Sequence, residues 1–282
     1  MGDEQVHIYE TADTFDLPDQ RVWVSGDWHG NAQWIQALLP AMRRRDASLR
    51  TILQLGDYGF SHDGNGARPI DYWAKRAGIE RVLVTLGNHE DWRPIGTAHE
   101  GHVPRQAIRV SDVVWLLPRP FRFRIGGRDV LSLGGASSVD KHLRTPGRDW
   151  FDAELITDEM EAAAVAEGRE DLFLTHESPT LAVPEVRAIL DRNVHGIPGE
   201  ARAISAAQRE RVQRVQDATQ PELHMHGHMH VYGELDLQEG RRVISLAHDN
   251  AEGNAGVLHM ATLGFEPLPL IYIRRRSRLT NR

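Results

Sequence analysis

Five short apolar runs, each followed at once by polar side chains that can bind metal ions, constrain the fold of this chain most. Each run is rich in aliphatic and β-branched residues and has the length of a buried β-strand. The runs are 22–25, 51–55, 81–86, 171–175 and 222–226, and the polar residues after them are Asp27, His29, Asp57, Asn88, His89, His176, His228 and His230. Because open α/β sheets bind ligands at the carboxyl ends of their strands, we expect these side chains to converge at one edge.

Helical patterns lie between several of these runs and indicate an α/β fold. The segment 34–45 places Trp34, Leu38 and Met42 on one apolar face. Further helical patterns cover 67–78, 157–167 and 197–215. The other strand-like segments are 107–117, the hairpin arms 121–125 and 130–133, and a C-terminal group at 232–237, 243–246, 257–263 and 270–273, which we expect to form a second, antiparallel set.

The bulk composition bounds the class of protein. With 282 residues, 40% of them apolar, we expect one domain over residues 1–282. A formal net charge of −7 with scattered acidic residues argues against non-specific binding to duplex nucleic acid. The absence of cysteine excludes disulfides, and no stretch approaches the roughly 18 apolar residues of a membrane span. We therefore expect a soluble, cytoplasmic protein with no obligate protein partner, and the sequence does not indicate its oligomeric state.

The polar residues after the five runs combine carboxylate, amide oxygen and imidazole, without any thiolate. This mixture suits Mn²⁺, Zn²⁺, Fe and similar ions and argues against a structural zinc cage. Five histidines and two aspartates are more than one tetrahedral ion can use, so two ions that share a bridging carboxylate are the simplest arrangement. Two ions about 3.5–4 Å apart can turn a shared water into a hydroxide nucleophile and clamp a phosphoryl oxygen, so the predicted chemistry is phosphoester hydrolysis.

The order and spacing of these residues resemble a known family, the calcineurin-like metallophosphoesterases. The matching motifs are Asp27-x-His29, Gly56-Asp57, Gly87-Asn88-His89-Glu90, Thr175-His176 and Gly227-His228-Met229-His230, which together span about residues 22–231. The resemblance implies a four-layer α-β-β-α sandwich of two mixed β-sheets. It also implies that the C-terminal strands, within 232–273, complete the second sheet before a basic tail at 274–282.

The resemblance further implies a role for each residue of the motifs. One divalent ion would be held by Asp27, His29 and His230, a second by Asn88, His176 and His228, and Asp57 would bridge the two. Mn²⁺ is the favoured ion, with Fe, Zn, Ni or Mg as alternatives. His89 would not be a ligand but a general acid that protonates the leaving oxygen after attack by the bridging hydroxide.

One departure from the family narrows the choice of branch. In the phosphoprotein phosphatases the Gly-Asp motif continues to Asp-Arg-Gly, whereas the corresponding residues here are Phe60-Ser61-His62. That branch is therefore disfavoured. The departure also leaves the residue that orients His89 open, with Glu90, Asp91 and Asp63 as candidates.

Candidate substrate contacts lie mainly in the glycine-bearing loop at 134–148. Its Lys141, Arg144 and Arg148 could hold phosphate oxygens away from the metals, and Arg144 is the first choice because a guanidinium can bind two oxygens at once. The alternative is a solvated basic loop. Trp92 could stack on a nucleobase, with core packing as the alternative. We expect His224 and His226, which alternate with His228 and His230, to be sheet residues rather than ligands.

Together these observations predict a two-metal hydrolase, a phosphodiesterase or phosphatase that acts on a nucleotide, a nucleic acid or another small phosphoester. A Ser/Thr phosphoprotein phosphatase is the alternative within the same chemistry. A non-catalytic scaffold with the same fold is the alternative outside it. The scaffold is disfavoured because the sequence retains every motif ligand and the acid.

Overall fold

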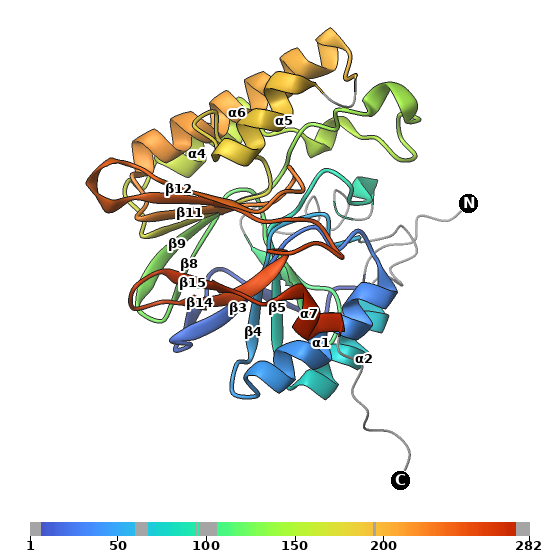
Figure 1. Cartoon of the computed structure of the whole chain (residues 1–282), viewed down its shortest axis with the longest axis vertical. Helices are drawn as coiled ribbons and strands as arrows, with labels where there is room; N and C mark the ends of the chain where they lie inside the picture. The colour runs from blue at the N-terminus through green and yellow to red at the C-terminus, as the bar shows by residue number, and fades with distance from the viewer. Residues whose placement is uncertain (1–6, 60–66, 94, 96–105, 194–195, 275–282) are drawn as a thin grey trace.

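Two β-sheets face each other, and helices cover the outer face of each (Figure 1). The computed structural model describes residues 7–59, 67–93, 95, 106–193 and 196–274. In sheet order, the first sheet contains β1 (Glu10–Ala12), β6 (Ala107–Arg109), β7 (Val114–Leu116), β5 (Arg81–Val84), β4 (Thr51–Gln54), β3 (Arg21–Ser25), β14 (Ala255–His259) and β15 (Gly264–Pro267). The second contains β12 (Gly233–Asp236), β13 (Arg242–Ser245), β11 (Leu223–His226), β10 (Leu172–Thr175), β9 (Arg128–Leu133), β8 (Phe121–Ile125) and β2 (Asp16–Leu17).

The outer helical layers contain both long and short helices. The first sheet is covered by α1 (Ala32–Arg45), α2 (Ala67–Ala77) and α7 (Leu270–Arg274), and the second by α4 (Asp158–Val165), α5 (Pro184–Arg192) and α6 (Gly199–Thr219) (Figure 1). Three short 3₁₀ helices lie at Lys141–Leu143, Asp152–Glu154 and Gln238–Gly240. The predicted sandwich of two mixed sheets between helices is confirmed. No helix of the described residues is both long and apolar enough to cross a membrane.

The alternation of side chains along a strand explains why β3 and β10 carry apolar residues on both faces. In β3, Val22 and Val24 pack between the two sheets, whereas Trp23 packs against the helices of the first sheet. In β10, Leu174 faces the other sheet and Phe173 faces α4 and α6. Both faces of these strands are buried, so no polar position is needed until each strand ends.

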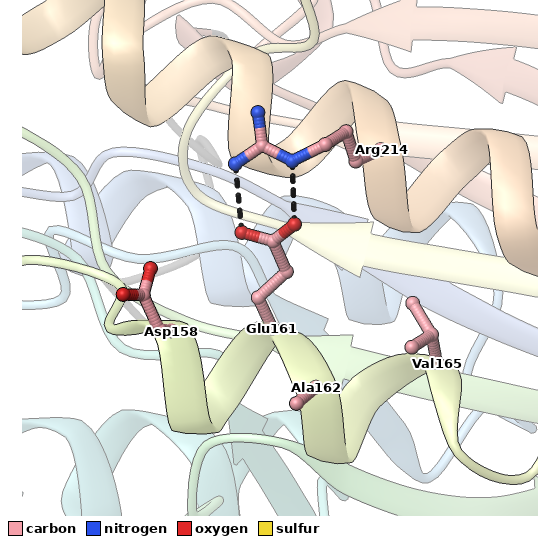
Figure 2. A pocket seen from close by; sticks show the side chains of 5 residues that line it. All are labelled: Asp158, Glu161, Ala162, Val165 and Arg214. Atoms are coloured by element: carbon pink, nitrogen blue, oxygen red, sulfur yellow. Dashed lines mark hydrogen bonds and ion pairs between the residues drawn. The ribbon is translucent and has the colours of Figure 1, made fainter.

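An ion pair between two helices holds the outer layer of the second sheet together. The carboxylate of Glu161 on α4 accepts two hydrogen bonds from the Arg214 guanidinium on α6, at 2.5 and 2.8 Å (Figure 2). Asp158, Ala162 and Val165 line the same shallow pocket, and Asp158 pairs with Arg211. Because its charges are paired with each other, this pocket has the features of a helix contact rather than of a binding site.

The direction of the strands brings the motif loops together. Strands β3, β4 and β5 run parallel in the first sheet, and β10 and β11 run parallel in the second. The loops after these strands meet across the sandwich. His176 Nδ1 lies 2.7 Å from the Leu55 carbonyl oxygen, and the His228 amide donates to the Asp27 carboxylate at 3.1 Å. The expected convergence at one edge is therefore present.

The C-terminal strands differ from the prediction. They do not form one antiparallel set that completes the second sheet, because β12 and β13 join the second sheet whereas β14 and β15 extend the first beside β3. In addition, β13 pairs with β11 in the parallel direction. The segment 270–273, predicted as a strand, begins the short helix α7, in which the Tyr272 amide donates to the Pro269 carbonyl. A four-residue apolar run does not distinguish the two structures by periodicity alone.

Other predicted elements are present with shifted ends, and one helix was missed. The N-cap of α4 is Thr157, whose hydroxyl accepts a hydrogen bond from the Met160 amide. The missed helix is α5, which begins at Pro184, a favoured residue in the first turn. The basic tail from Arg275 lies outside the described residues.

Candidate metal centre

The motif loops turn through a backbone conformation that side chains rarely adopt. Asp27, His29, Asp57, His228 and His230 have φ angles of 42°, 48°, 49°, 65° and 59°, and they are half of the ten non-glycine residues with positive φ in the described part of the chain. Residues of this kind persist where their surroundings fix them, and they cluster at functional sites. The loops therefore hold these side chains in place at some cost to local stability.

Two glycines allow the loops to approach the buried carboxylates. A Cβ atom on Gly87 would lie 2.3 Å from Asp57 Oδ1, and one on Gly227 would lie 2.4 Å from Asp27 Oδ2. Any other residue would displace the carboxylate that it touches. The glycines of the Gly-Asn-His-Glu and Gly-His-Met-His motifs thus serve the packing of Asp57 and Asp27.

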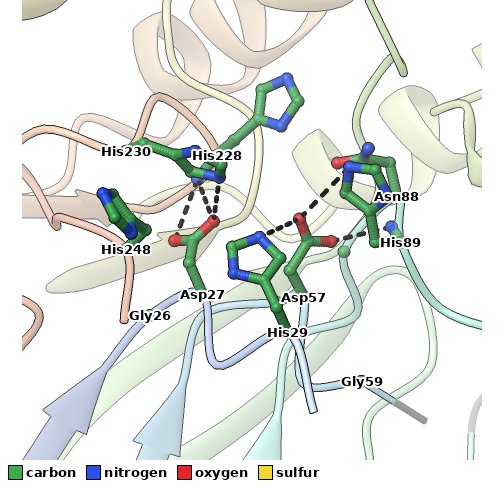
Figure 3. A network of polar contacts seen from close by, with 12 residues as sticks. Gly26, Asp27, His29, Asp57, Gly59, Asn88, His89, His228, His230 and His248 are labelled. Atoms are coloured by element: carbon green, nitrogen blue, oxygen red, sulfur yellow. Dashed lines mark hydrogen bonds and ion pairs between the residues drawn. The ribbon is translucent and has the colours of Figure 1, made fainter. Parts of the chain in front are cut away.

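Four of the predicted ligands form a compact group. One ligand atom from each of Asp27, His29, Asp57 and His230 lies within 4.8 Å of every other (Figure 3). His230 Nε2 is 3.5 Å from Asp27 Oδ1, and His29 Nε2 is 3.5 Å from Asp57 Oδ2. Both carboxylates are fully buried, while His29 and His230 reach toward the surface.

The remaining predicted ligands lie on the other side of Asp57. His176 Nε2 is 3.2 Å from Asp57 Oδ1 and 3.0 Å from Asn88 Oδ1. The centroids of the His176 and His228 rings are 5.1 Å apart. Asp57 therefore directs one carboxylate oxygen toward each group, as a bridging ligand would.

One oxygen of Asp57 provides a test of whether a cation fits here. Asp57 Oδ2 is buried and, among the described residues, accepts no hydrogen bond. Burial opposes ionisation, but the charges of His176 and His89 and the contacts with His176 and His29 hold the pKa of Asp57 well below its ordinary value. A buried, charged oxygen without a donor is costly, and a divalent cation would satisfy it. The oxygen and imidazole donors around it suit such an ion.

The aspartates of this centre raise the pKa of two neighbouring imidazoles, so these imidazoles bind protons more tightly. Burial lowers the pKa of His29, but Asp57, Asp27 and Asp249 outweigh it and raise that pKa to about 9. Burial is likewise outweighed at His176, where Asp57 and Asp27 raise the pKa to about 10. Two buried aspartates thus create a negative centre that draws cations to these imidazoles.

His89, the predicted general acid, lies at the edge of this group. Its backbone amide donates to Asp57 Oδ1 at 2.8 Å, and its Nε2 is 4.0 Å from Asp57 Oδ2 and 3.2 Å from Arg144 Nη2. Burial, and then the charge of Arg144, lower the pKa of His89, although Asp57 and Asp140 oppose them.

The candidates for orienting His89 have other contacts. The Glu90 carboxylate accepts hydrogen bonds from the backbone amides of Tyr58, Gly59 and Gly87 at 2.8, 3.2 and 3.4 Å, so it joins the Asp57 loop to the Asn88 loop. Asp91 binds the Arg93 guanidinium through both oxygens. Asp63, like the Phe60-Ser61-His62 segment, lies outside the described residues.

The basic loop brings one of its three candidate residues to the site. The Arg144 guanidinium is held by both oxygens of Asp140 at 2.7 Å and by the Asp149 carbonyl at 3.0 Å, and it faces His89. The Lys141 ammonium lies 3.8 Å above the Trp150 ring. Arg148 is exposed.

Trp92 does not present a surface on which a nucleobase could stack. Only 4% of the residue is exposed, its ring belongs to the core of the first sheet, and the Arg119 guanidinium lies 4.2 Å above it. The covered aromatic face favours core packing, the alternative for Trp92, over stacking on a nucleobase.

The two other histidines of β11 lie inside the second sheet, as expected. His224 is buried between the Thr175 hydroxyl at 2.8 Å and the Gln216 side-chain oxygen at 2.7 Å. Burial lowers the pKa of His226 to about 4, which keeps it neutral.

Sequence reasoning missed two sets of residues that support the ligands. Asn88 donates to the Ser138 hydroxyl at 3.0 Å, which donates to buried Glu154 at 2.8 Å. Asp249 lies 3.1 Å from His29 Nδ1. No local pattern signals the first set, but Asp249 follows the apolar run at 243–246, which is a strand parallel to β11. If this strand had been known to run parallel to β11, its end would have identified Asp249 in the same way as the other site residues.

Comparisons with known proteins bear on the fold and the family of the chain. A crystal structure of TT1561 from Thermus thermophilus superposes with a TM-score of 0.53 at 10% identity, covering 89% of this chain and 99% of that one. A dimetal phosphatase from Danio rerio gives 0.46 at 14% identity, with coverages of 86% and 93%. At such a low identity, the similarity to TT1561 shows the fold alone. No curated protein matches the chain. The model of the calcineurin-like phosphoesterases matches residues 20–232, and the chain therefore belongs to that family.

Proposed function

We propose that this protein hydrolyses a small phosphoester, a nucleotide or a nucleic acid with the help of two divalent metal ions. The observation that carries the proposal is the buried Asp57 carboxylate, which lies between two groups of oxygen and nitrogen ligands with one oxygen that accepts no hydrogen bond from the described residues. Family membership supports the reaction class, a metal-dependent phosphoesterase.

The proposed ligand sets follow the two groups around Asp57. Asp27, His29 and His230 would hold one ion, Asn88, His176 and His228 the other, and Asp57 would contribute to both. Mn²⁺ is the favoured ion, with Fe, Zn, Ni or Mg as alternatives. When bound, such ions supply Lewis-acid activation of water and of phosphoryl oxygens.

The chain's own side chains supply orientation and the proton. Arg144 is held in one orientation by Asp140, so the part of its guanidinium that faces His89 could bind a phosphate oxygen with little loss of side-chain entropy. His89 lies beside it and would give a proton to the leaving oxygen. His89 Nε2 lies 4.0 Å from Asp57 Oδ2 and 3.2 Å from Arg144 Nη2.

Metal removal and a substrate panel test this proposal. We expect EDTA-treated protein to be inactive and Mn²⁺ to restore turnover of one or more of p-nitrophenyl phosphate, bis-p-nitrophenyl phosphate, cyclic nucleotides and dinucleotides, with two ions per chain by elemental analysis. Mn²⁺-loaded protein that turns over no phosphoester would contradict the proposal. Faster turnover of Ser/Thr phosphopeptides than of bis-p-nitrophenyl phosphate would instead favour a phosphoprotein phosphatase.

Removing the Arg144 guanidinium tests its contact with phosphate. We expect Arg144→Ala to raise KM by about 10-fold or more and to lower kcat less, because a charge-assisted contact is worth about 1.5–3 kcal/mol. Arg144→Lys should recover little, since an ammonium lacks the planar fork. Steady-state kinetics with Arg148→Ala, which removes the same charge from the same loop, gives the comparison. A KM that stays at the wild-type value in Arg144→Ala would assign this loop to solvent.

A further inference from the structure

The turn after β13 brings the Asp249 carboxylate to the candidate metal centre. This turn lies after residue 232, where the match to the family model ends. Because β13 runs parallel to β11, its carboxyl end lies at the same edge as the ligands His228 and His230. Asp249 lies in this turn, whereas the family model ends at residue 232. His248, its neighbour, stands beside His230 with ring centroids 5.2 Å apart (Figure 3).

Asp249 contacts the imidazole nitrogen of His29 that faces away from Asp57. Asp249 Oδ1 is 3.1 Å from His29 Nδ1, and His29 Nε2 is 3.5 Å from Asp57 Oδ2. A carboxylate only accepts hydrogen bonds, so Nδ1 carries the hydrogen of this pair. The contact thereby fixes both the orientation of the ring and the nitrogen left to bind an ion.

Asp249 is itself held by several hydrogen bonds. Its Oδ2 accepts from the side-chain amides of Asn31 at 2.5 Å and Asn250 at 2.8 Å. Its backbone amide donates to the Asp27 carbonyl at 2.9 Å. Only 13% of its side chain is exposed. A carboxylate with this many donors is positioned before any ion binds.

Asn254 ties the whole turn to the Asp27 loop. Its side-chain amide donates to the carbonyls of Gly26 at 2.5 Å and Ala247 at 2.9 Å, while its oxygen accepts from Ser25 and Trp34. The turn is therefore joined directly to the strand end that presents Asp27 and His29.

We propose that Asp249 is a positioning residue of the metal centre, which holds the His29 imidazole so that Nε2 is presented to the ion on the side of Asp27 and His230. This inference rests on the proposed function. It adds that one of the two ion positions depends on the turn after β13, and the other does not. Carboxylate partners of metal-binding histidines typically contribute about 10–100-fold to metal affinity.

The test is a Mn²⁺ titration of the metal-free full chain, followed by calorimetry and by the EPR signal of coupled Mn²⁺ pairs. We expect Asp249→Ala to weaken one of the two binding steps by about 10–100-fold and to delay the coupled signal to higher Mn²⁺. Asp249→Asn, which keeps an acceptor oxygen, should lose less than Asp249→Ala. The control is Glu252→Ala, which removes the same charge from the same turn. Glu252 accepts a hydrogen bond from the Leu270 amide, so this variant should bind both ions as the wild type does.

Two results in the variants would overturn the inference. Wild-type affinity at both steps in Asp249→Ala would show that His29 needs no such partner. Equal weakening of both steps, with a lowered Tm of the metal-free protein in Asp249→Ala and Asp249→Asn alike, would show that the turn only supports the fold. If the wild type itself binds no pair of ions, the proposed function fails, and the inference fails with it.

Discussion

Asp57→Asn should abolish measurable phosphoesterase activity and weaken the binding of both ions. The change keeps the size of the side chain and leaves an oxygen to accept the His89 amide, but it removes the charge from the oxygen that accepts no hydrogen bond from the described residues. Loss of a shared anionic ligand costs the site several kcal/mol, and each 1.36 kcal/mol is a factor of ten in rate, so we expect a loss of about 10³-fold or more.

Elemental analysis of the desalted, Mn²⁺-loaded variant is the decisive measurement for Asp57. Asp71→Asn is a matched control, because Asp71 is a largely buried carboxylate that accepts from Ser111 and from the Val113 amide and is not among the proposed ligands. It should lower stability and leave the metal content at two ions per chain. If Asp57→Asn also kept both ions, Asp57 could not be the bridge.

The positions of the proposed ligands were predictable because local sequence determines where each strand ends. A buried strand needs apolar residues on both faces, so the first polar residue marks its end, as Ser25 and Asp27 do after Val24. Gly87 and Gly227, which directly precede Asn88 and His228, mark loops that pack against the Asp57 and Asp27 carboxylates. These signals lie within a few residues of each ligand and need no knowledge of the tertiary structure.

The residues around the ligands were harder to predict because distant contacts determine their roles. Trp92 has an aromatic ring on which a nucleobase could stack, but in the folded chain the Arg119 guanidinium lies over that ring. Asp249 was overlooked because the direction of a strand cannot be read from its sequence, and β13 was expected to be antiparallel. Arg144 was the first choice among the three basic candidates in its loop, but its contacts with Asp140 could not be read from the sequence.

With an alkyl phosphoester as the substrate, His89→Ala should retain both ions and lower kcat by about 10²–10⁴-fold, the usual contribution of a general acid. The His89 side chain is not among the proposed ligands, and its backbone amide, which binds Asp57, remains in the variant. His142→Ala, which changes an exposed histidine of the Arg144 loop, is the control and should keep the wild-type rate. Wild-type turnover in His89→Ala would remove His89 from the mechanism.

The choice of leaving group separates proton donation by His89 from a structural role. Burial and Arg144 lower the pKa of His89 in the free protein, but a phosphate anion bound between the two would favour the imidazolium. An alkoxide leaving group needs that proton, whereas p-nitrophenolate departs readily without it. The loss in His89→Ala should therefore be large for an alkyl phosphoester and small for its p-nitrophenyl analogue. Equal losses for both substrates would mean that His89 positions the phosphate, beside Arg144, instead of protonating the product.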